Sequence, residues 1–336
     1  MVQSRCGCDQ RHPAVCKTGC DLFDCEHFLS SCEILLDTSI WRRHVATVSR
    51  EKERDMSILA AAKPPLETGL VATICGHPGS GKTTLACTFG KSFLIRTKGE
   101  GMPRDVPADM MPDALDETDS ADSLFEQMIA LLREPHDYKT LIVDSVSGLD
   151  DMFIRDVLDR DKDAKNIQTA HGGYGAGRDM VTNLHWRVRR AAEHLRKKRG
   201  MNTIFIAHTE ISRVEPPDSD SYTQWGLKLH HKSVAPYVDQ VDLVGFLRED
   251  TAVTGKERKR AVGSGDRVLV TYLTPTAVTK NRFGIRDDLQ VSHLENPLLG
   301  LIPGLPGAAP AKPARGKPAA PVTDETETEN KDENNE

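Results

Sequence analysis

The amino-acid sequence predicts an α/β fold, in which a mainly parallel sheet has helices on both faces and an antiparallel extension. Two observations favour this class. First, short apolar runs alternate with longer helical patterns through the middle of the 336-residue chain, the order typical of a parallel sheet. Second, several of these runs are continuously apolar, as expected for strands that are buried on both faces.

Six apolar runs are expected to form strands. In order, they are LVATIC (70–75), SFLI (92–95), TLIVDS (140–145), NTIFIAH (202–208), DLVGFL (242–247) and RVLVTYL (267–273). The polar segment 251–266 joins the last two runs, and we expect it to be a loop. These last two strands then form the antiparallel extension of the sheet.

Four helical patterns separate the expected strands. They cover residues 83–91, 120–134, 148–160 and 178–199. The second pattern places Leu124, Met128 and Leu131 three and four residues apart, and hence on one face of a helix. Such a face is expected to pack on the sheet.

The composition divides the chain into three zones. Residues 1–55 form a cysteine-rich segment, residues 56–296 form the α/β domain, and residues 297–336 form a tail. The tail is rich in Pro, Ala, Gly and Lys and then in acidic residues, so it has too little apolar surface to offset chain entropy. We predict that the tail is disordered.

The net charge of −6 resides in the end of the tail. Residues 323–336 contain seven acids and one base, so the rest of the chain sums to about zero. Composition therefore neither requires nor excludes a nucleic-acid partner. Since no apolar run approaches the roughly 18 residues of a membrane helix, and the start lacks the apolar core of a signal peptide, we expect a cytoplasmic protein without a membrane partner.

Six of the eight cysteines lie within residues 1–55. A cytoplasmic location favours free thiols or metal ligands over disulfides. Thiolates suit Zn²⁺, although the paired C-x2-C spacing of many zinc modules is absent. A dispensable extension is the alternative, because the α/β domain can begin at Met56. The candidate zinc ligands are Cys6, Cys8, Cys16, Cys20, Cys25 and Cys32.

Residues 76–83, GHPGSGKT, match the P-loop pattern G-x-x-x-x-G-K-[ST] between an apolar run and a helical pattern. The glycines let successive backbone N–H groups face phosphates. We expect Lys82 to contact the β- and γ-phosphates of ATP and Thr83 to ligate Mg²⁺. An ordinary glycine-rich turn is the alternative. The expected nucleotide-binding residues are Gly76, His77, Pro78, Gly79, Ser80, Gly81, Lys82, Thr83 and Thr84.

The run LIVDS (141–145) places Asp144 at the carboxyl end of a buried strand. There its carboxylate can hold a magnesium-bound water beside the P-loop. A strand-end aspartate that caps a turn is the alternative. Ser145 rather than a glutamate follows Asp144, so the catalytic base has to come from elsewhere in the chain.

Together these motifs resemble the RecA-like recombination ATPases. A later strand ending in His208 and the string KNRFG (280–284), which is similar to the motif of that name in bacterial RadA, strengthen the resemblance. The wider pattern resembles the phage-encoded RecA-like nucleotide-binding proteins associated with single-strand annealing, over about residues 66–290. It comprises DYKTLIVDSVSGLD, GGYGAG, RGMNTIFIAHTE, the segment Tyr222–His230 and KNRFG.

The resemblance implies further catalytic residues. His208 corresponds to a polar sensor of the γ-phosphate, with a hydrogen-bonded strand-end histidine as the alternative. Lys280 and Arg282 match positions that reach a neighbouring subunit's nucleotide in RadA-like proteins, as an arginine finger does, with a solvated basic turn as the alternative. Glu100 stands near the place of the catalytic glutamate, in a loop that Lys98 makes basic, and is otherwise a loop glutamate.

Candidate DNA-binding residues follow the strand that ends in His208, where RecA-like folds place DNA-facing loops. Basic and aromatic side chains together suit single strands, whereas a solvated charged loop is the alternative. They are Tyr222, Lys228, His230, His231 and Lys232, with Trp225 nearby. The basic residues of 178–199 are expected to form a solvated helix face, with phosphate contact as the alternative. GGYGAG (172–177) suggests a mobile loop.

The resemblance thus implies an ATPase that acts on single-stranded DNA in phage-type recombination or annealing. It also implies a homo-oligomer, in a ring or filament, and a single-strand-binding protein as a further partner. The alternative is a slow nucleotide-dependent switch or loader that binds a protein partner, which the unusual loop around Glu100 would suit. A small-molecule kinase needs an arginine-rich lid and an acceptor pocket, and the sequence indicates neither.

Overall fold

The computed structural model describes residues 69–254 and 260–305. The strands of this part are β1 (Val71–Gly76), β2 (Ser92–Arg96), β3 (Asp113–Ala114), β4 (Thr140–Asp144), β5 (Asn202–Val214), β6 (Tyr222–Leu227), β7 (Leu243–Thr254), β8 (Arg260–Val270), β9 (Lys280–Asn281) and β10 (Leu289–Val291). The helices are α2 (Lys82–Cys87), α3 (Ala121–Arg133), α4 (Val146–Asp159), the 3-10 helix η2 (Ala170–Gly172), α5 (Ala176–Arg199) and α6 (His231–Val238).

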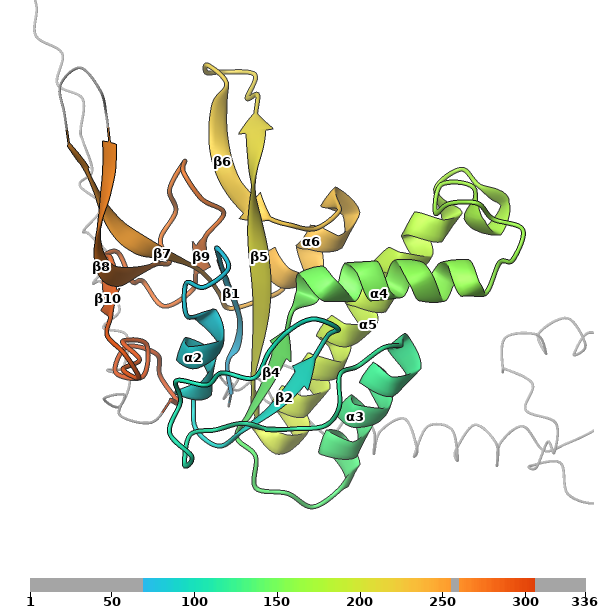
Figure 1. Ribbon diagram of the computed structural model, residues 1–336, viewed down its shortest axis with the longest axis horizontal. Coiled ribbons are helices and arrows are strands. Elements are labelled where there is room, and N and C mark those ends of the chain that lie inside the picture. The colour runs from blue at the N-terminus through green and yellow to red at the C-terminus, as the bar shows by residue number, and fades with distance from the viewer. Residues whose placement is uncertain (1–68, 255–259, 306–336) are drawn as a thin grey trace, which may run out of the picture. The chain divides into compact units, whose positions relative to one another are not determined.

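A central sheet organises the domain, with the strand order β10-β8-β7-β1-β5-β4-β2-β3 (Figure 1). The strands from β7 to β3 in this order all pair in parallel. β8 and β10 continue the sheet antiparallel beyond β7, and β6 pairs antiparallel with β5. The structure therefore confirms the predicted α/β class and its antiparallel extension.

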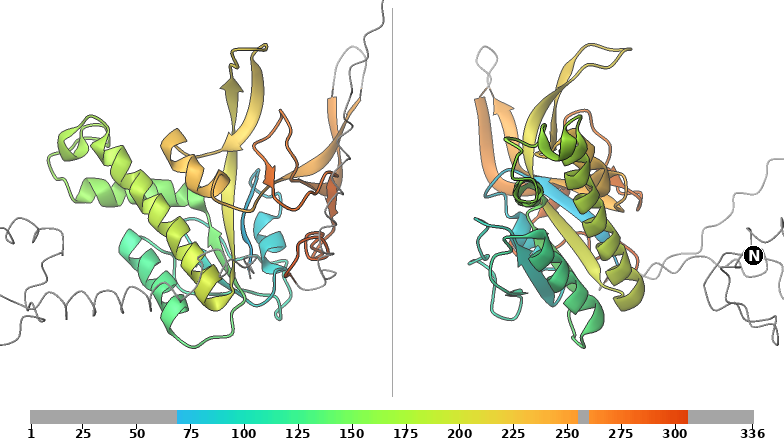
Figure 2. Two further views of the ribbon diagram at one scale, coloured as in Figure 1. Left: turned by 180° about the vertical axis from the view of Figure 1, so that it is seen from behind. Right: turned by 90° about the vertical axis from the view of Figure 1, so that its right-hand side faces the viewer.

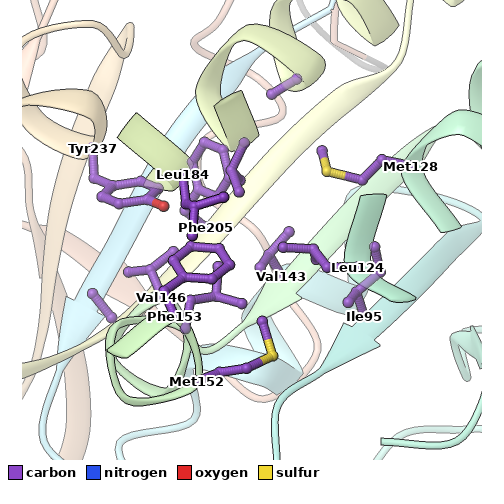
Figure 3. Packing of buried hydrophobic residues seen from close by; sticks show 14 of the residues in the cluster. Ile95, Leu124, Met128, Val143, Val146, Met152, Phe153, Leu184, Phe205 and Tyr237 are labelled. Atoms are coloured by element: carbon purple, nitrogen blue, oxygen red, sulfur yellow. The ribbon is translucent and has the colours of Figure 1, made fainter. Parts of the chain in front are cut away.

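Successive side chains of the central strands alternate between two apolar layers, as the pleat of a strand requires. In β4, Leu141 and Val143 join the layer under α3, α4, α5 and α6, whereas Ile142 joins the layer under α2. Figure 2 shows α5 running diagonally across the first face. Close packing of that layer is visible in Figure 3, where Phe205 of β5 lies near Phe153 of α4. Both faces are thus covered, as predicted from the continuous apolar runs.

Parallel pairing brings the ends of three strands to one edge of the sheet. β5 lies between β1 and β4, with Gly76 level with His208 and Asp144 level with Ile206. The carboxyl ends of these strands therefore meet at the same edge, which is where open α/β sheets bind their ligands.

The helix predicted over residues 83–91 is shorter in the structure. α2 ends at Cys87, and the hydroxyl of Thr88 donates to the Leu85 carbonyl at 2.6 Å, so a side chain satisfies a helix-end acceptor. The other three helices agree closely with the expected patterns. α3 begins after Ser120, whose hydroxyl accepts from the Ser123 N–H at 3.3 Å.

Two predicted boundaries in the second half of the chain were wrong. β5 continues to Val214 and forms a hairpin with β6, which extends away from the rest of the sheet in Figure 1. Much of the segment 251–266 is strand rather than loop, because its backbone pairs across β7 and β8. Hairpin arms of this kind need no continuous apolar run, since only strands buried on both faces require one.

The packed domain extends past Asn296, where the tail was expected to begin. Leu298, Ile302 and Leu305 are at most 6% exposed and pack in the layer under α2. Their three- and four-residue spacing gives an apolar face that a Pro/Gly-rich composition obscures. Within residues 69–254 and 260–305, no helix is long and apolar enough to cross a membrane.

Candidate nucleotide-binding site

The P-loop connects β1 to α2 at the carboxyl edge of the sheet. A side chain at Gly76 would place its Cβ 2.3 Å from the Leu247 carbonyl oxygen of the adjacent strand, so only glycine fits there. Gly79 and Gly81 have φ angles of 78° and 88°, in the left-handed region that favours glycine. Both requirements come from the backbone itself, which explains why the motif is readable from sequence.

Lys82 folds back over this loop. Its Nζ donates to the carbonyl oxygens of Gly76 at 3.1 Å and His77 at 2.7 Å, and the residue is only 6% exposed. Burial lowers the pKa of the ammonium group, and the nearby Asp144 carboxylate opposes that shift. These carbonyl groups belong to the P-loop, so the ammonium group lies beside the backbone that is expected to surround the phosphates. There it can form a charged hydrogen bond with a phosphate.

Thr83 and Asp144 join the P-loop to β4. The Thr83 hydroxyl donates to Oδ2 of Asp144 at 2.6 Å, and Asp144 is 3% exposed. Burial raises the pKa of the Asp144 carboxyl to about 6, although the hydrogen bond from Thr83 favours the charged form. A hydroxyl and a buried carboxylate in contact are the oxygen ligands that magnesium prefers beside phosphates.

Glu100 is held in the same site by two donors. Its Oε1 lies 2.9 Å from Nε2 of His208 and accepts from the Ser145 hydroxyl at 2.8 Å. The hydrogen bond with His208 lowers the pKa of Glu100, burial opposes this shift, and Ser145 adds to it. Ser145 also accepts from the Gly148 N–H at 3.1 Å, so it caps α4 as well. An ionised Glu100 is thus fixed at the sheet edge.

These groups line one cavity of about 370 Å³. Its lining residues are Pro78, Gly79, Gly81, Lys82, Thr83, Thr84, Glu100, Gly101, Met102, Pro103, Asp105, Asp144, His208 and Arg267. The size falls in the range of small-molecule sites. Nδ1 of His208 in this lining and the Ser80 hydroxyl of the adjoining P-loop are buried and have no hydrogen-bond partner within the described part of the chain. Glycine-lined backbone, one buried cation and a hydroxyl–carboxylate pair together fit a magnesium-bound nucleoside triphosphate.

A P-loop whose threonine contacts a strand-end aspartate defines a nucleotide-binding P-loop ATPase. The chain belongs to the AAA domain family, whose model matches residues 68–283, more than half of the 336-residue sequence. No curated protein matches the sequence. ATP and, in general, Mg²⁺ are the ligands of this class, which agrees with the cofactors predicted from the P-loop.

Most of the sequence-predicted nucleotide site is brought together by the fold. Lys82, Thr83, Glu100, Asp144 and His208 all line the same cavity, although one helix, one loop and two strands supply them. Their individual roles in hydrolysis stay predictions.

Lys280 and Arg282 lie at the opposite edge of the sheet. They adjoin the start of β7, and a cavity beside Arg282 is lined by Gly69 and Leu70, just before β1. β1 has six residues, which span roughly 17 Å at about 3.3 Å per step, and the P-loop follows its far end. These two cations therefore do not reach the P-loop of their own chain.

Both cations have partners at that edge. Lys280 Nζ donates to the carbonyl oxygens of Val238 at 3.2 Å and Asp239 at 2.6 Å. Arg282 pairs with Asp242 at 3.0 Å, but its side chain remains 52% exposed. They are therefore anchored rather than fully solvated, and Arg282 is accessible from outside.

The candidate DNA residues occupy strand and helix as well as loop. Tyr222 is the first residue of β6, and His231 and Lys232 begin α6. Lys228 and His230 lie between these elements. The prediction that all of them lie in loops was thus wrong, because β5 extends and needs a pairing strand. Whether they bind DNA stays a prediction.

Trp225 does not offer a free stacking face. Its ring lies 4.4 Å from that of His77 in the P-loop, edge to face, and 6.3 Å from that of Phe246. Trp225 is partly buried and packs against the main apolar layer. Trp225 instead connects β6 to the P-loop.

Several predictions concern residues outside the described part. These are the zinc ligands among residues 1–55 and the acidic segment 323–336. Within the described residues, no group of three or more His, Cys, Asp or Glu side chains is arranged to hold a metal ion.

Two charged residues of the cavity were not predicted from the sequence. Asp105 accepts from the Thr84 hydroxyl at 3.1 Å, and Arg267 of β8 lies against Gly81. Neither belongs to a motif. Their proximity to the P-loop arises from loop and strand packing, which leaves no local sequence signal.

Proposed function

We propose that this ATPase acts on single-stranded DNA, in recombination or annealing of the kind associated with phage-encoded RecA-like proteins. The observation that best supports this proposal is an exposed aromatic residue beside basic side chains. Tyr174 has the full exposure of an isolated residue, 106% of the reference area. A side chain that gains nothing from packing within its own chain is available to a partner.

The backbone around Tyr174 has an unusual conformation. Tyr174 has a φ of 53°, uncommon for a residue with a side chain, and lies between glycines that also have positive φ. A Cβ at Gly175 would lie 3.8 Å from Nζ of Lys232. Tyr174 is therefore close to the basic start of α6, where the His230 and His231 rings lie 4.2 Å apart.

This combination matches single-stranded nucleic acid. Base stacking on an aromatic side chain contributes about 1–3 kcal/mol per base, and cations follow the backbone phosphates. Lys232 pairs with Asp179 at 2.7 Å, but both side chains are well exposed, so phosphate can compete for the ammonium group. Tyr222, Lys228, His230 and His231 extend the same proposal along β6 and α6.

Bound ATP with magnesium supplies the phosphoryl group that is transferred to water. Lys82 holds the phosphate charge, and Thr83 with Asp144 holds the metal. Glu100, ionised and oriented by Ser145 and His208, accepts a proton from the attacking water. Lys280 and Arg282 complete the nucleotide site of a neighbouring subunit, so the active form is a head-to-tail homo-oligomer, a ring or filament.

ATP hydrolysis measured with and without single-stranded DNA tests this function. We expect single strands to stimulate turnover, and Tyr174→Ala to weaken their binding about five- to a hundredfold, in line with one lost stacking contact. Tyr174→Trp should retain binding, whereas Leu273→Ala, at an apolar side chain that is 88% exposed on another loop, should change nothing.

The opposite result separates the alternatives. Unstimulated turnover together with no detectable binding of single strands would reject the DNA proposal. A nucleotide-dependent switch or loader that binds a protein partner would then explain the exposed tyrosine, and a pull-down that depends on both ATP and Tyr174 would identify that partner class.

A further inference from the structure

Arg267 reaches the P-loop from a distant part of the chain. It lies on β8, opposite Glu249 of β7 and Val291 of β10. β7 is also the neighbour of β1, and its Leu247 carbonyl approaches Gly76 so closely that no side chain fits between them. The β7–β8 pair therefore carries Arg267 to the carboxyl edge where the nucleotide site lies.

The guanidinium group of Arg267 lies directly on Gly81. A Cβ at Gly81 would lie 2.3 Å from Nη1 and 3.0 Å from Cζ of Arg267. The arginine thus occupies the space that any side chain at Gly81 would need. Gly81 immediately precedes Lys82, so two cations border the same short piece of backbone.

Arg267 is half-buried and makes no hydrogen bond or ion pair with any of the described residues. The carboxylates that share its cavity have other partners: Asp144 accepts from Thr83, Glu100 from Ser145 and His208, and Asp105 from Thr84. A partly desolvated cation without a partner is unfavourable. An anion from outside the chain would satisfy it.

Charge in the cavity points to the same conclusion. Lys82 and Arg267 are its two permanent cations, and they face three carboxylates, Glu100, Asp105 and Asp144. A triphosphate brings further negative charge, only part of which magnesium neutralises. Lys82 alone would leave the occupied site strongly negative, and Arg267 is the remaining cation that lines it.

We infer that Arg267 binds the phosphate chain of the nucleotide, beside Lys82 and from within the same chain. A guanidinium group matches phosphate oxygens through two parallel N–H donors, which an ammonium group cannot provide. This assignment rests on nucleotide binding by the P-loop and is independent of the DNA partner proposed above. It is also distinct from Lys280 and Arg282, which act on a neighbour's nucleotide.

Binding of ATP and ADP, measured without DNA, tests the assignment. Arg267→Ala and the uncharged, similarly long Arg267→Gln should each weaken both nucleotides about ten- to a hundredfold, as expected for lost charged hydrogen bonds. Arg267→Lys should bind more tightly than Arg267→Gln but more weakly than the unaltered protein, because it restores the charge without the two parallel N–H donors. Arg155→Ala, which removes an exposed arginine from α4, should bind as the unaltered protein does.

The unfolding midpoint of each variant without nucleotide separates binding from packing. Loss of affinity in Arg267→Gln with an unchanged midpoint supports the assignment. Wild-type affinity in Arg267→Gln overturns it. The assignment is also overturned if Arg267→Gln and Arg267→Lys lower the unfolding midpoint equally and lose equal nucleotide affinity. Arg267 would then only support the P-loop. Failure of DNA binding would affect none of these results.

Discussion

The two edges of the central sheet use their charged residues in different ways. At the carboxyl edge, Lys82, Asp144 and Glu100 come from separate segments and line one cavity. At the amino edge, Lys280 and Arg282 come from one short string and bind the backbone or a carboxylate of their own chain. The first edge gathers charged side chains around one cavity, whereas the second exposes Arg282 too far from the P-loop of its own chain to reach it.

Asp242 explains how Arg282 is kept in place without being buried. This carboxylate is 5% exposed, accepts from the Val71 N–H at 3.2 Å, and pairs with both Arg196 at 2.9 Å and Arg282 at 3.0 Å. Removal of Arg282 leaves Asp242 with an ion-pair partner. Substitution of Arg282 therefore does not leave the buried Asp242 carboxylate without an ion-pair partner. A loss of activity in such a variant can then be separated from a loss of stability.

The largest effect is expected at the carboxyl edge. Lys82→Ala removes the buried cation beside the P-loop carbonyls and should abolish detectable ATP binding, while the apo fold persists. Fluorescent or labelled ATP titration measures this directly. Lys162→Ala, at an exposed lysine after α4, is the matched control. A folded Lys82→Ala protein with unchanged ATP affinity would remove the P-loop from the mechanism.

The next largest effect is expected at the amino edge. Arg282→Ala should keep its ATP affinity and lose turnover by about a thousandfold, the lower end for a missing arginine finger. Its apo stability should fall by no more than about 1 kcal/mol, because the ion pair is half-exposed. Arg286→Ala, an exposed arginine in the following turn, should retain activity.

Mixing the two variants sharpens this prediction. Lys82→Ala chains supply Arg282, and Arg282→Ala chains supply an intact P-loop, so part of the turnover should return at mixed interfaces. Co-assembly is checked with differently tagged chains. An inactive mixture of chains that do assemble would show that the two edges do not complete one another.

A smaller loss is expected within the carboxyl edge itself. Glu100→Gln keeps the shape and one acceptor for Ser145 and His208 but removes the charge, so turnover should fall about a hundredfold, the lower end for a lost general base. ATP affinity should change little. Glu126→Gln on the exposed side of α3 is the control. Turnover within twofold of the unaltered protein would assign the base to another group.

The smallest effect is on stability and depends on pH. Burial raises the pKa of Asp144 from its ordinary 3.8 to about 6. The free energy of unfolding of the apo protein therefore falls as the pH rises through that range, because the carboxyl group ionises while buried. Asp144→Asn should therefore stabilise the apo protein at pH 8, by up to about 3 kcal/mol, and by less at pH 5. Urea unfolding at both pH values measures this. An equal gain at both would mean that the charge of Asp144 is not the cause.

The same substitution should weaken magnesium-dependent ATP binding, because the amide is a poorer ligand for a hard cation. In the unaltered protein, that binding should decline as the pH falls below about 6, where protonation of Asp144 competes with the metal.

The sequence by itself determined the fold class, the P-loop, the strand that ends in Asp144 and the presence of His208 and Glu100 near it. The reason is that these features are local: glycine conformation, strand burial and strand-to-helix order are properties of contiguous residues. Parallel pairing then brings the strand ends together almost automatically, because parallel neighbours share one carboxyl edge.

Tertiary structure alone decided which other side chains reach that edge. The position of Arg267 against Gly81 depends on the pairing of β8 with β7 and of β7 with β1, and the contact of Trp225 with His77 depends on the β5–β6 hairpin. It also decided that Lys280 and Arg282 lie a strand's length from their own P-loop. Contacts of this kind join residues that are far apart in the chain. They depend on strand register, which packing and pairing set, so no spacing in the sequence predicts these contacts.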